Sequence, residues 1–184
     1  FAYLFALLVI LWPDDIVDSV TPAEEHTALV EIKGIIAPET QASAENVLKA
    51  LRKAFEDEKT KGIILRVNSP GGSPVQAGRV NDEIRRLRKE HEDIPVYAVV
   101  EDLCASGGYY IAAAADKIYV DKASLVGSIG VRIDAFGFEQ AMDELGIERR
   151  LLTAGKNKGI LDPFSPLPEE QREYLQGILD KLHR

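Results

Sequence analysis

The sequence predicts an α/β protein with a mostly parallel sheet and helices on both faces. Apolar runs of strand length alternate with longer segments whose apolar residues recur at helical spacing, which is the pattern of a parallel sheet with helical connections. The runs at 62–67 and 95–100 are apolar along most of their length, as is typical of strands buried on both faces. The connections between successive strands are therefore expected to be right-handed crossovers.

The first half of the domain is predicted to hold three strands and two helices. Ser43 is a predicted N-cap, and the apolar residues after it fall on one helical face. Ser73 followed by Pro74 predicts a second helix with the proline in its first turn. In chain order the elements are a strand at 28–36, a helix at 43–58, a strand at 62–67, a helix at 73–90 and a strand at 95–100.

The second half continues the alternation with shorter elements. The segment after Ser106 is rich in helix formers. Gly146 is the predicted C-cap of a helix at 138–145. A polar loop at 153–166 precedes the last helix. In chain order the elements are a helix at 106–115, a strand at 117–120, an extended segment at 124–131, a helix at 138–145, a strand at 147–152 and a helix at 168–183.

The composition limits the classes of function. The 184 residues, 46% of them hydrophobic and 28% charged, are enough for one globular domain with a proper core. A net charge of −8 without a long basic stretch argues against nucleic acid as a partner. One cysteine excludes an internal disulfide and a cysteine-based zinc site. We therefore expect no metal and no cofactor.

The chain starts with an uninterrupted apolar run at 1–12, which ends at Pro13. A span across a bilayer needs about 20 apolar residues, but Tyr3 and Trp12 lie near the ends of the run, as in a segment that leaves lipid. We interpret residues 1–13 as part of an N-terminal membrane anchor, with the core of a cleaved signal peptide as the alternative. We expect a linker at 14–27 and one domain at 28–184 that is incomplete at its C-terminus.

Two glycine-rich turns carry the candidate chemistry. Residues 70–73 (Pro-Gly-Gly-Ser) and 105–108 (Ala-Ser-Gly-Gly) each leave a strand and open a helix. Backbone N–H groups from two such turns can converge on one oxygen, as in an oxyanion hole, and Ser106 would be the nucleophile. The simpler alternative is that Ser106 is only an N-cap. A phosphate cradle is the third alternative, but neither GxxxxGK[ST] nor GxGxxG is present.

A serine nucleophile needs a base, and the three histidines lie in a linker, in a charged turn and at the penultimate position, as His26, His91 and His183. A neutral lysine can serve if burial lowers its pKa from about 10.4 toward 7–8. The loop at 153–164 offers Lys156 and Lys158, and Lys158 is favoured because apolar residues follow it. Ser128 is a candidate hydroxyl to orient the amine, although it could simply satisfy a turn.

These motifs together resemble the signal peptide peptidase A (SppA) family, serine peptidase family S49, whose domain is similar to the Clp-protease/crotonase fold. The resemblance rests on residues 68–73, 105–110, 127–131 and 155–163, which occur in the order and spacing of the family. It implies a Ser-Lys dyad with Ser106 as nucleophile and Lys158 as general base. It also implies that Ser128 orients the lysine and that Gly72 and Gly107 form the oxyanion hole.

The resemblance further implies a membrane-anchored endopeptidase that degrades remnant signal peptides, so the expected substrates are cleaved signal peptides. Members of the family assemble into ring- or dome-shaped homo-oligomers, in which a site can be shared between chains. The implied location is the cell membrane, specifically the inner membrane of a bacterium. A single-pass anchor would hold the catalytic domain on the extracytoplasmic side. The alternatives are a crotonase-like acyl-CoA enzyme, which would use the paired N–H groups for a thioester enolate, and a non-catalytic membrane scaffold.

Overall fold

The computed structural model describes residues 24–183, which fall into two units that meet between Gly127 and Ser128. The predicted anchor at 1–13 and most of the predicted linker lie outside the described residues. Among the helices within residues 24–183, none has the length and apolar character that crossing a membrane requires.

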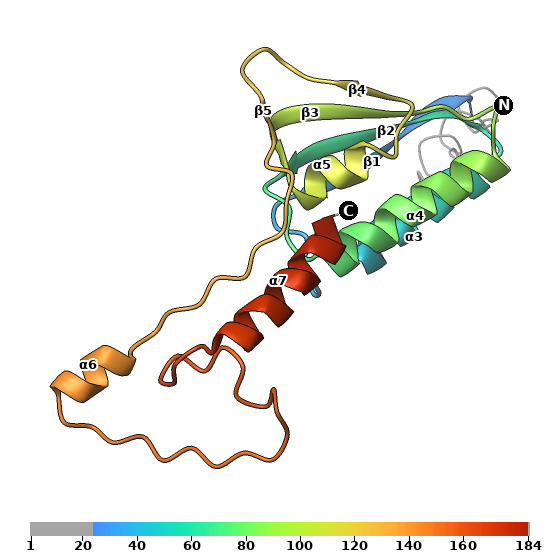
Figure 1. The fold of residues 1–184 in the computed structure, drawn as a ribbon. Helices are drawn as coiled ribbons and strands as arrows, with labels where there is room; N and C mark the ends of the chain where they lie inside the picture. The colour runs from blue at the N-terminus through green and yellow to red at the C-terminus, as the bar shows by residue number, and fades with distance from the viewer. Residues whose placement is uncertain (1–23, 184) are drawn as a thin grey trace, which may run out of the picture. The chain divides into compact units, whose positions relative to one another are not determined.

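The first unit is organised around a five-stranded parallel sheet (Figure 1). Strands β1 (His26–Lys33), β2 (Thr60–Ser69), β3 (Val96–Ala105) and β4 (Lys117–Tyr119) lie in this order, and β5 (Leu125–Gly127) pairs with the C-terminal end of β3. All four pairings are parallel. The predicted mostly parallel sheet is confirmed.

Three helices connect the strands of this unit: α3 (Ala44–Glu56), α4 (Pro74–Glu90) and α5 (Gly107–Ala112). Both predicted N-caps form, because the hydroxyls of Ser43 and Ser73 each accept a hydrogen bond from the backbone N–H three residues on, at 3.4 Å. The stripe predicted for α4 is buried, and it consists of Ala77, Val80, Ile84 and Leu87.

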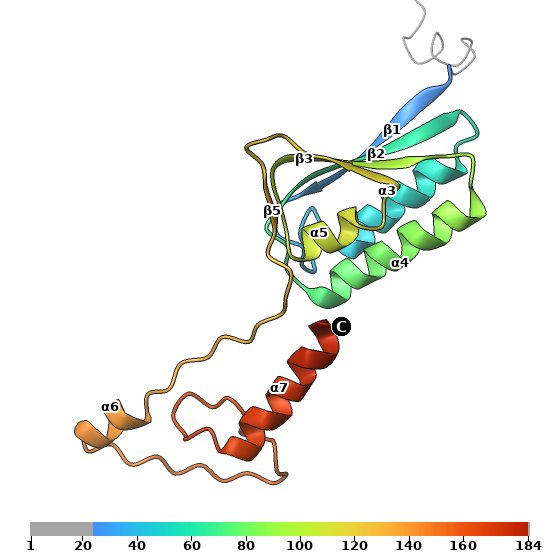
Figure 2. The ribbon, with the colours of Figure 1, turned by 45° about the horizontal axis from the view of Figure 1, so that its top comes forward.

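The three helices pack on one face of the sheet (Figure 2). The row of paired residues Val30, Leu65 and Ala98 is buried beneath them. The neighbouring row faces the other side and includes Leu29, which is 53% exposed. Helices of this unit therefore do not supply the expected cover on the second face, where polar side chains such as Arg66 alternate with apolar ones.

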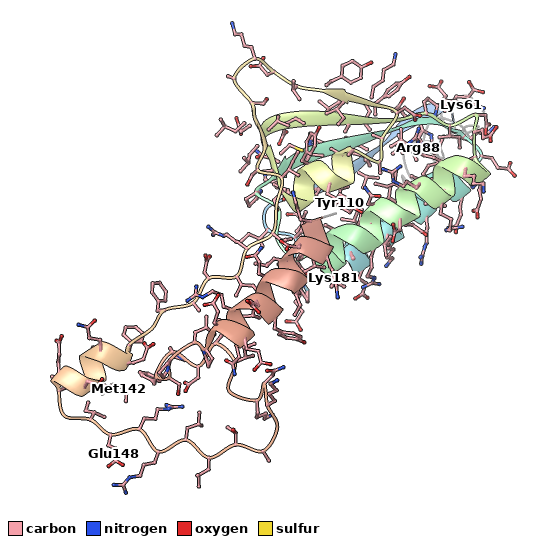
Figure 3. The ribbon with its side chains drawn as sticks, in the orientation of Figure 1. Lys61, Arg88, Tyr110, Met142, Glu148 and Lys181 are labelled. Carbon is pink, nitrogen blue, oxygen red and sulfur yellow. The ribbon has the colours of Figure 1, made fainter. Side chains whose placement is uncertain are left out.

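The second unit holds two helices, α6 (Glu139–Glu144) and α7 (Glu169–His183), at the predicted positions. Gly146 follows α6 with φ +67°, as expected for a C-cap glycine. The predicted strand at 147–152 is wrong: the segment is irregular, because a strand needs a partner and this unit offers none among its described residues. No described residue from Ser128 onward is buried, and Figure 3 shows the side chains there, including Met142 and Glu148.

Candidate active site

Ser106 lies in a sharp turn between the end of β3 and the start of α5. Its backbone has φ +51° and ψ −121°, a conformation that residues with side chains rarely adopt. Two hydrogen bonds fix it: its N–H donates to the carbonyl of Gly127 at 2.8 Å, and its carbonyl accepts from the N–H of Tyr110 at 2.9 Å. A strained strand-to-helix turn of this kind presents the nucleophilic serine in α/β-hydrolases.

Ser106 occupies the N-cap position of α5, and its carbonyl accepts the first hydrogen bond of the helix. Its side chain, however, makes no capping hydrogen bond to α5. A strained conformation costs on the order of 1–3 kcal/mol. Among the described residues the hydroxyl makes no capping bond that would offset this strain, so capping alone does not explain the conformation of Ser106.

Gly72 lies in the second turn, which runs beside the residues that follow β1. Ile36 donates its N–H to the carbonyl of Gly71 at 2.9 Å and accepts the N–H of Ser73 at 2.7 Å. In a parallel ladder, the residue opposite such a doubly bonded residue directs its own N–H to the other side. Gly72 therefore presents its N–H away from Ile36.

The two turns lie against each other. A Cβ atom built on Gly71 would lie 2.7 Å from both the backbone nitrogen of Gly107 and the Cβ of Ser106. A Cβ atom built on Gly107 would lie 3.6 Å from the backbone nitrogen of Gly72. The structure thus brings together Ser106, Gly72 and Gly107, the three residues of the site that belong to the first unit.

The N–H groups of Gly72 and Gly107 are not used by the described part of the fold. Within residues 24–183, neither donates to a backbone or side-chain acceptor. Gly107 is the first residue of α5, and the first N–H groups of a helix lack an acceptor within the helix. Two unused donors beside a serine hydroxyl are the arrangement that stabilises the oxyanion of an acyl-transfer reaction.

Asn81 lies on α4 and holds α5 by a hydrogen bond, and it was not identified from the sequence. Its side chain is 1% exposed and donates to the carbonyl of Tyr110, which lies on α5 (Figure 3), at 2.5 Å. Its Oδ1 accepts from Arg85 at 2.8 Å. The signal in the sequence was a polar residue directly beside Val80 in the buried stripe of α4.

Ser128 and Lys158 belong to the second unit, so their pairing with Ser106 stays a prediction. Ser128 directly follows Gly127, whose carbonyl fixes Ser106, and has φ +52°. Lys158 is exposed within its unit, and no ion pair among the described residues involves it. Lys156, the alternative base, instead pairs with Glu170 of α7.

The two histidines of the first unit lie near the N-terminal ends of the strands, whereas Ser106 lies at the C-terminal end of β3. His26 begins β1 and contacts Thr60 at the start of β2, at 3.3 Å. His91 follows α4 as its C-cap, and the centroid of its ring lies 5.3 Å from that of Phe55. Because Ser106 follows the C-terminal end of a strand parallel to β1, neither histidine is placed to accept its proton.

A model of peptidase family S49 matches residues 88–184, just over half of the chain. The chain is 46% identical over 133 residues, 72% of its length, to a protein named Na(+)/H(+) antiporter NhaA from Brucella melitensis, of which the match covers 18%. It is 32% identical over 151 residues, 81% of its length, to the chloroplastic serine protease SPPA of Arabidopsis thaliana, of which the match covers 22%.

Among solved structures, ClpP1 from Listeria monocytogenes matches with 28% sequence identity and a TM-score of 0.39, over 47% of this chain and 46% of that one. The chain spans much less than two thirds of the length of each of these proteins.

Proposed function

Because the chain belongs to peptidase family S49, we propose that it supplies the catalytic machinery of a membrane-anchored serine endopeptidase that degrades remnant signal peptides. The observation that carries the proposal is the conformation of Ser106. Its backbone is strained and doubly hydrogen-bonded, its hydroxyl is unused by the helix, and two unbonded glycine N–H groups lie beside it. A scaffold would have no use for this combination.

In the proposed reaction, the amine of Lys158 takes the proton of the Ser106 hydroxyl while Oγ attacks the peptide carbonyl carbon. The N–H groups of Gly72 and Gly107 donate to the oxygen that becomes negative. The C–N bond then breaks, and the departing amine receives its proton from Lys158. Water, deprotonated by Lys158, hydrolyses the resulting ester and regenerates Ser106.

This mechanism requires a neutral lysine, and the second unit by itself leaves Lys158 exposed. Desolvation disfavours the charged form of a lysine. We therefore propose that the chain forms a homo-oligomer in which a neighbouring chain buries Lys158 and completes the site. Ser128 would accept a hydrogen bond from the neutral amine or donate one to it, and so orient it.

The membrane part of the proposal rests on the apolar run at 1–12 and on the family resemblance. Residues 1–13 would anchor the enzyme in the cell membrane, with the catalytic domain on the extracytoplasmic side. Cleaved signal peptides contain an apolar segment, so an enzyme anchored in the same membrane would meet them there.

Three substitutions test the dyad in the assembled protein: Ser106→Ala, Lys158→Ala and, as the matched control, Lys156→Ala. Loss of either dyad member should lower the hydrolysis of an apolar peptide by at least about 10³-fold. Lys156→Ala removes the same charge from the same loop and only an exposed ion pair, so its rate should stay within about twofold of wild type.

A fluorophosphonate probe provides an independent readout, because it labels only an activated serine. We expect labelling of Ser106 in the wild type and none in Lys158→Ala. Near-normal hydrolysis by Lys158→Ala, with loss in Lys156→Ala, would assign the base to Lys156. Hydrolysis by Ser106→Ala, or an unlabelled Ser106 in an active wild type, would overturn the proposal.

A further inference from the structure

Ser69 is the last residue of β2, and its side chain is completely buried. It makes two hydrogen bonds of opposite sense. Its Oγ donates to the carbonyl of Gly34 at 2.7 Å and accepts from the N–H of Gly71 at 3.1 Å. The hydroxyl therefore joins the end of β1 to the turn that carries Gly72.

The first of these bonds replaces a rung that the backbone cannot form. Gly34 donates its N–H to the carbonyl of Asn68 at 2.9 Å. In a parallel ladder, the carbonyl of Gly34 would then accept from the N–H two residues further on, at position 70. That residue is proline, which has no N–H. The hydroxyl of Ser69 supplies the missing donor.

The second bond stabilises an irregularity in the pairing. The ladder resumes where Ile36 lies opposite Gly72. Two steps of chain lead from Gly34 to Ile36, but three lead from Ser69 to Gly72, so the turn contains one extra residue, as in a β-bulge. The bulge leaves the N–H of Gly71 without a backbone acceptor, and Ser69 Oγ accepts it.

Ser69 also contacts the helix that follows the nucleophile. A Cβ atom built on Gly108 would lie 3.1 Å from the carbonyl oxygen of Ser69 and 3.3 Å from its Cβ. One buried residue thus contacts both turns of the site. Fixing the peptide groups around Gly71 also fixes the direction of the next N–H, which belongs to Gly72.

We propose that Ser69 is a positioning residue of the oxyanion hole, because its buried hydroxyl holds the bulged turn that directs the Gly72 N–H toward the carbonyl under attack. The inference rests on the proposed function. It differs from that function in assigning a role to a residue that touches neither substrate nor the reacting atoms.

The test compares Ser69→Ala with Ser43→Ala in the full assembled protein. Ser43 is a matched control: it is also a buried serine, 5% exposed, and its hydroxyl caps α3 by accepting from the N–H of Asn46. Both variants lose a buried hydroxyl, so thermal unfolding should detect a loss of stability in both. A merely structural role predicts equal kinetic effects.

We expect Ser69→Ala to lower kcat by about 10²-fold, the low end of the effect of losing one oxyanion-hole donor. KM should stay within about twofold, and the pH dependence of kcat should keep its shape, because the base is untouched. Ser43→Ala should keep the wild-type kcat. Ser69→Thr, which retains a hydroxyl, should recover at least about tenfold of the kcat lost in Ser69→Ala.

Wild-type activity that depends on Ser106 establishes the proposed function first, so the two failures are distinguishable. With that activity present, a kcat of Ser69→Ala within about threefold of wild type would overturn the inference. Equal losses in Ser69→Ala and Ser43→Ala would also overturn it. If Ser69→Ala does not fold, Ser69→Cys takes its place, because a thiol is only a weak donor and acceptor. Its kcat should fall by at least about tenfold, and a kcat within about threefold of wild type would overturn the inference.

Discussion

Replacement of Gly72 by alanine tests the proposed oxyanion hole directly. The new Cβ atom would lie 2.2 Å from the carbonyl oxygen of Ile36 and 2.9 Å from its carbon. The first separation is 0.8 Å below the 3.0 Å limit that real Cβ contacts respect. Gly72 also has φ +152°, which disfavours a side chain. The turn must therefore move away from Ile36 and carry its N–H out of place.

The expected magnitude follows from that displacement. A shift of roughly 1 Å in a positioned group can lower a rate by about 10²-fold, and loss of one oxyanion-hole donor costs about 10²–10³ in kcat, or ~2.7–4 kcal/mol. We expect kcat of Gly72→Ala to fall within this range with a small change in KM. Gly72 is exposed at the edge of the unit, so the fold should survive.

The assay is the hydrolysis of an apolar peptide by the assembled protein, with circular dichroism to verify the fold. Gly62→Ala is the matched control: a Cβ there would meet only atoms of Pro95, at 3.7 Å, which is ordinary contact. Its kcat should equal that of wild type. If Gly72→Ala keeps kcat within about threefold of wild type, the assignment of the Gly72 N–H to the oxyanion hole is refuted.

Two further predictions concern the helices that support the site. Hydrogen bonds from Arg86 and Arg52 outweigh burial and lower the pKa of Glu83 from 4.5 to about 2, so its contribution to stability is complete above pH 4.5 and is lost as the pH falls toward 2. Because the guanidinium groups of Arg52 and Arg86 are about half exposed, solvent screens these ion pairs, and we expect a contribution of about 1–2 kcal/mol to the free energy of unfolding. Urea unfolding at pH 7 and pH 3 should show a smaller change in the free energy of unfolding for Glu83→Gln than for wild type. Asn81→Ala should lower the free energy of unfolding by about 1–3 kcal/mol, because it leaves the Tyr110 carbonyl without its buried donor. It should also lower kcat more than Glu83→Gln does, and equal kcat values for the two variants would refute a specific role of Asn81 in holding α5.

Local signals in the sequence were enough to predict most helices and strands of the first unit. The caps at Ser43 and Ser73 mark the starts of α3 and α4, and the apolar runs mark β2 and β3. The first strand ends three residues before the predicted boundary, because Gly34 has φ +81° and leaves the extended conformation. The segment at 147–152 has the composition of a strand, but pairing decides whether a strand forms, and pairing is not a local property.

The candidate site was predictable only in part. The two glycine turns indicated Ser106 and two converging N–H groups, since parallel strands end at one edge of a sheet, whereas the family resemblance supplied Gly72 and Gly107. The roles of Ser69 and Asn81 depend on long-range hydrogen bonds to Gly34 and to Tyr110. A single sequence does not reveal such bonds, because both side chains resemble ordinary polar residues until their burial is known.

The positive φ of Ser106 sets folding against the proposed activity at one position. Glycine would adopt the same turn without the strain of about 1–3 kcal/mol, so the most stable residue at position 106 is one that cannot attack a carbonyl. If Ser106 is the nucleophile, as proposed, a screen for thermal stability alone would favour glycine there and return well-folded, inactive protein. Stabilising substitutions for this chain should therefore be sought away from the turn, where the requirements of folding and catalysis do not conflict.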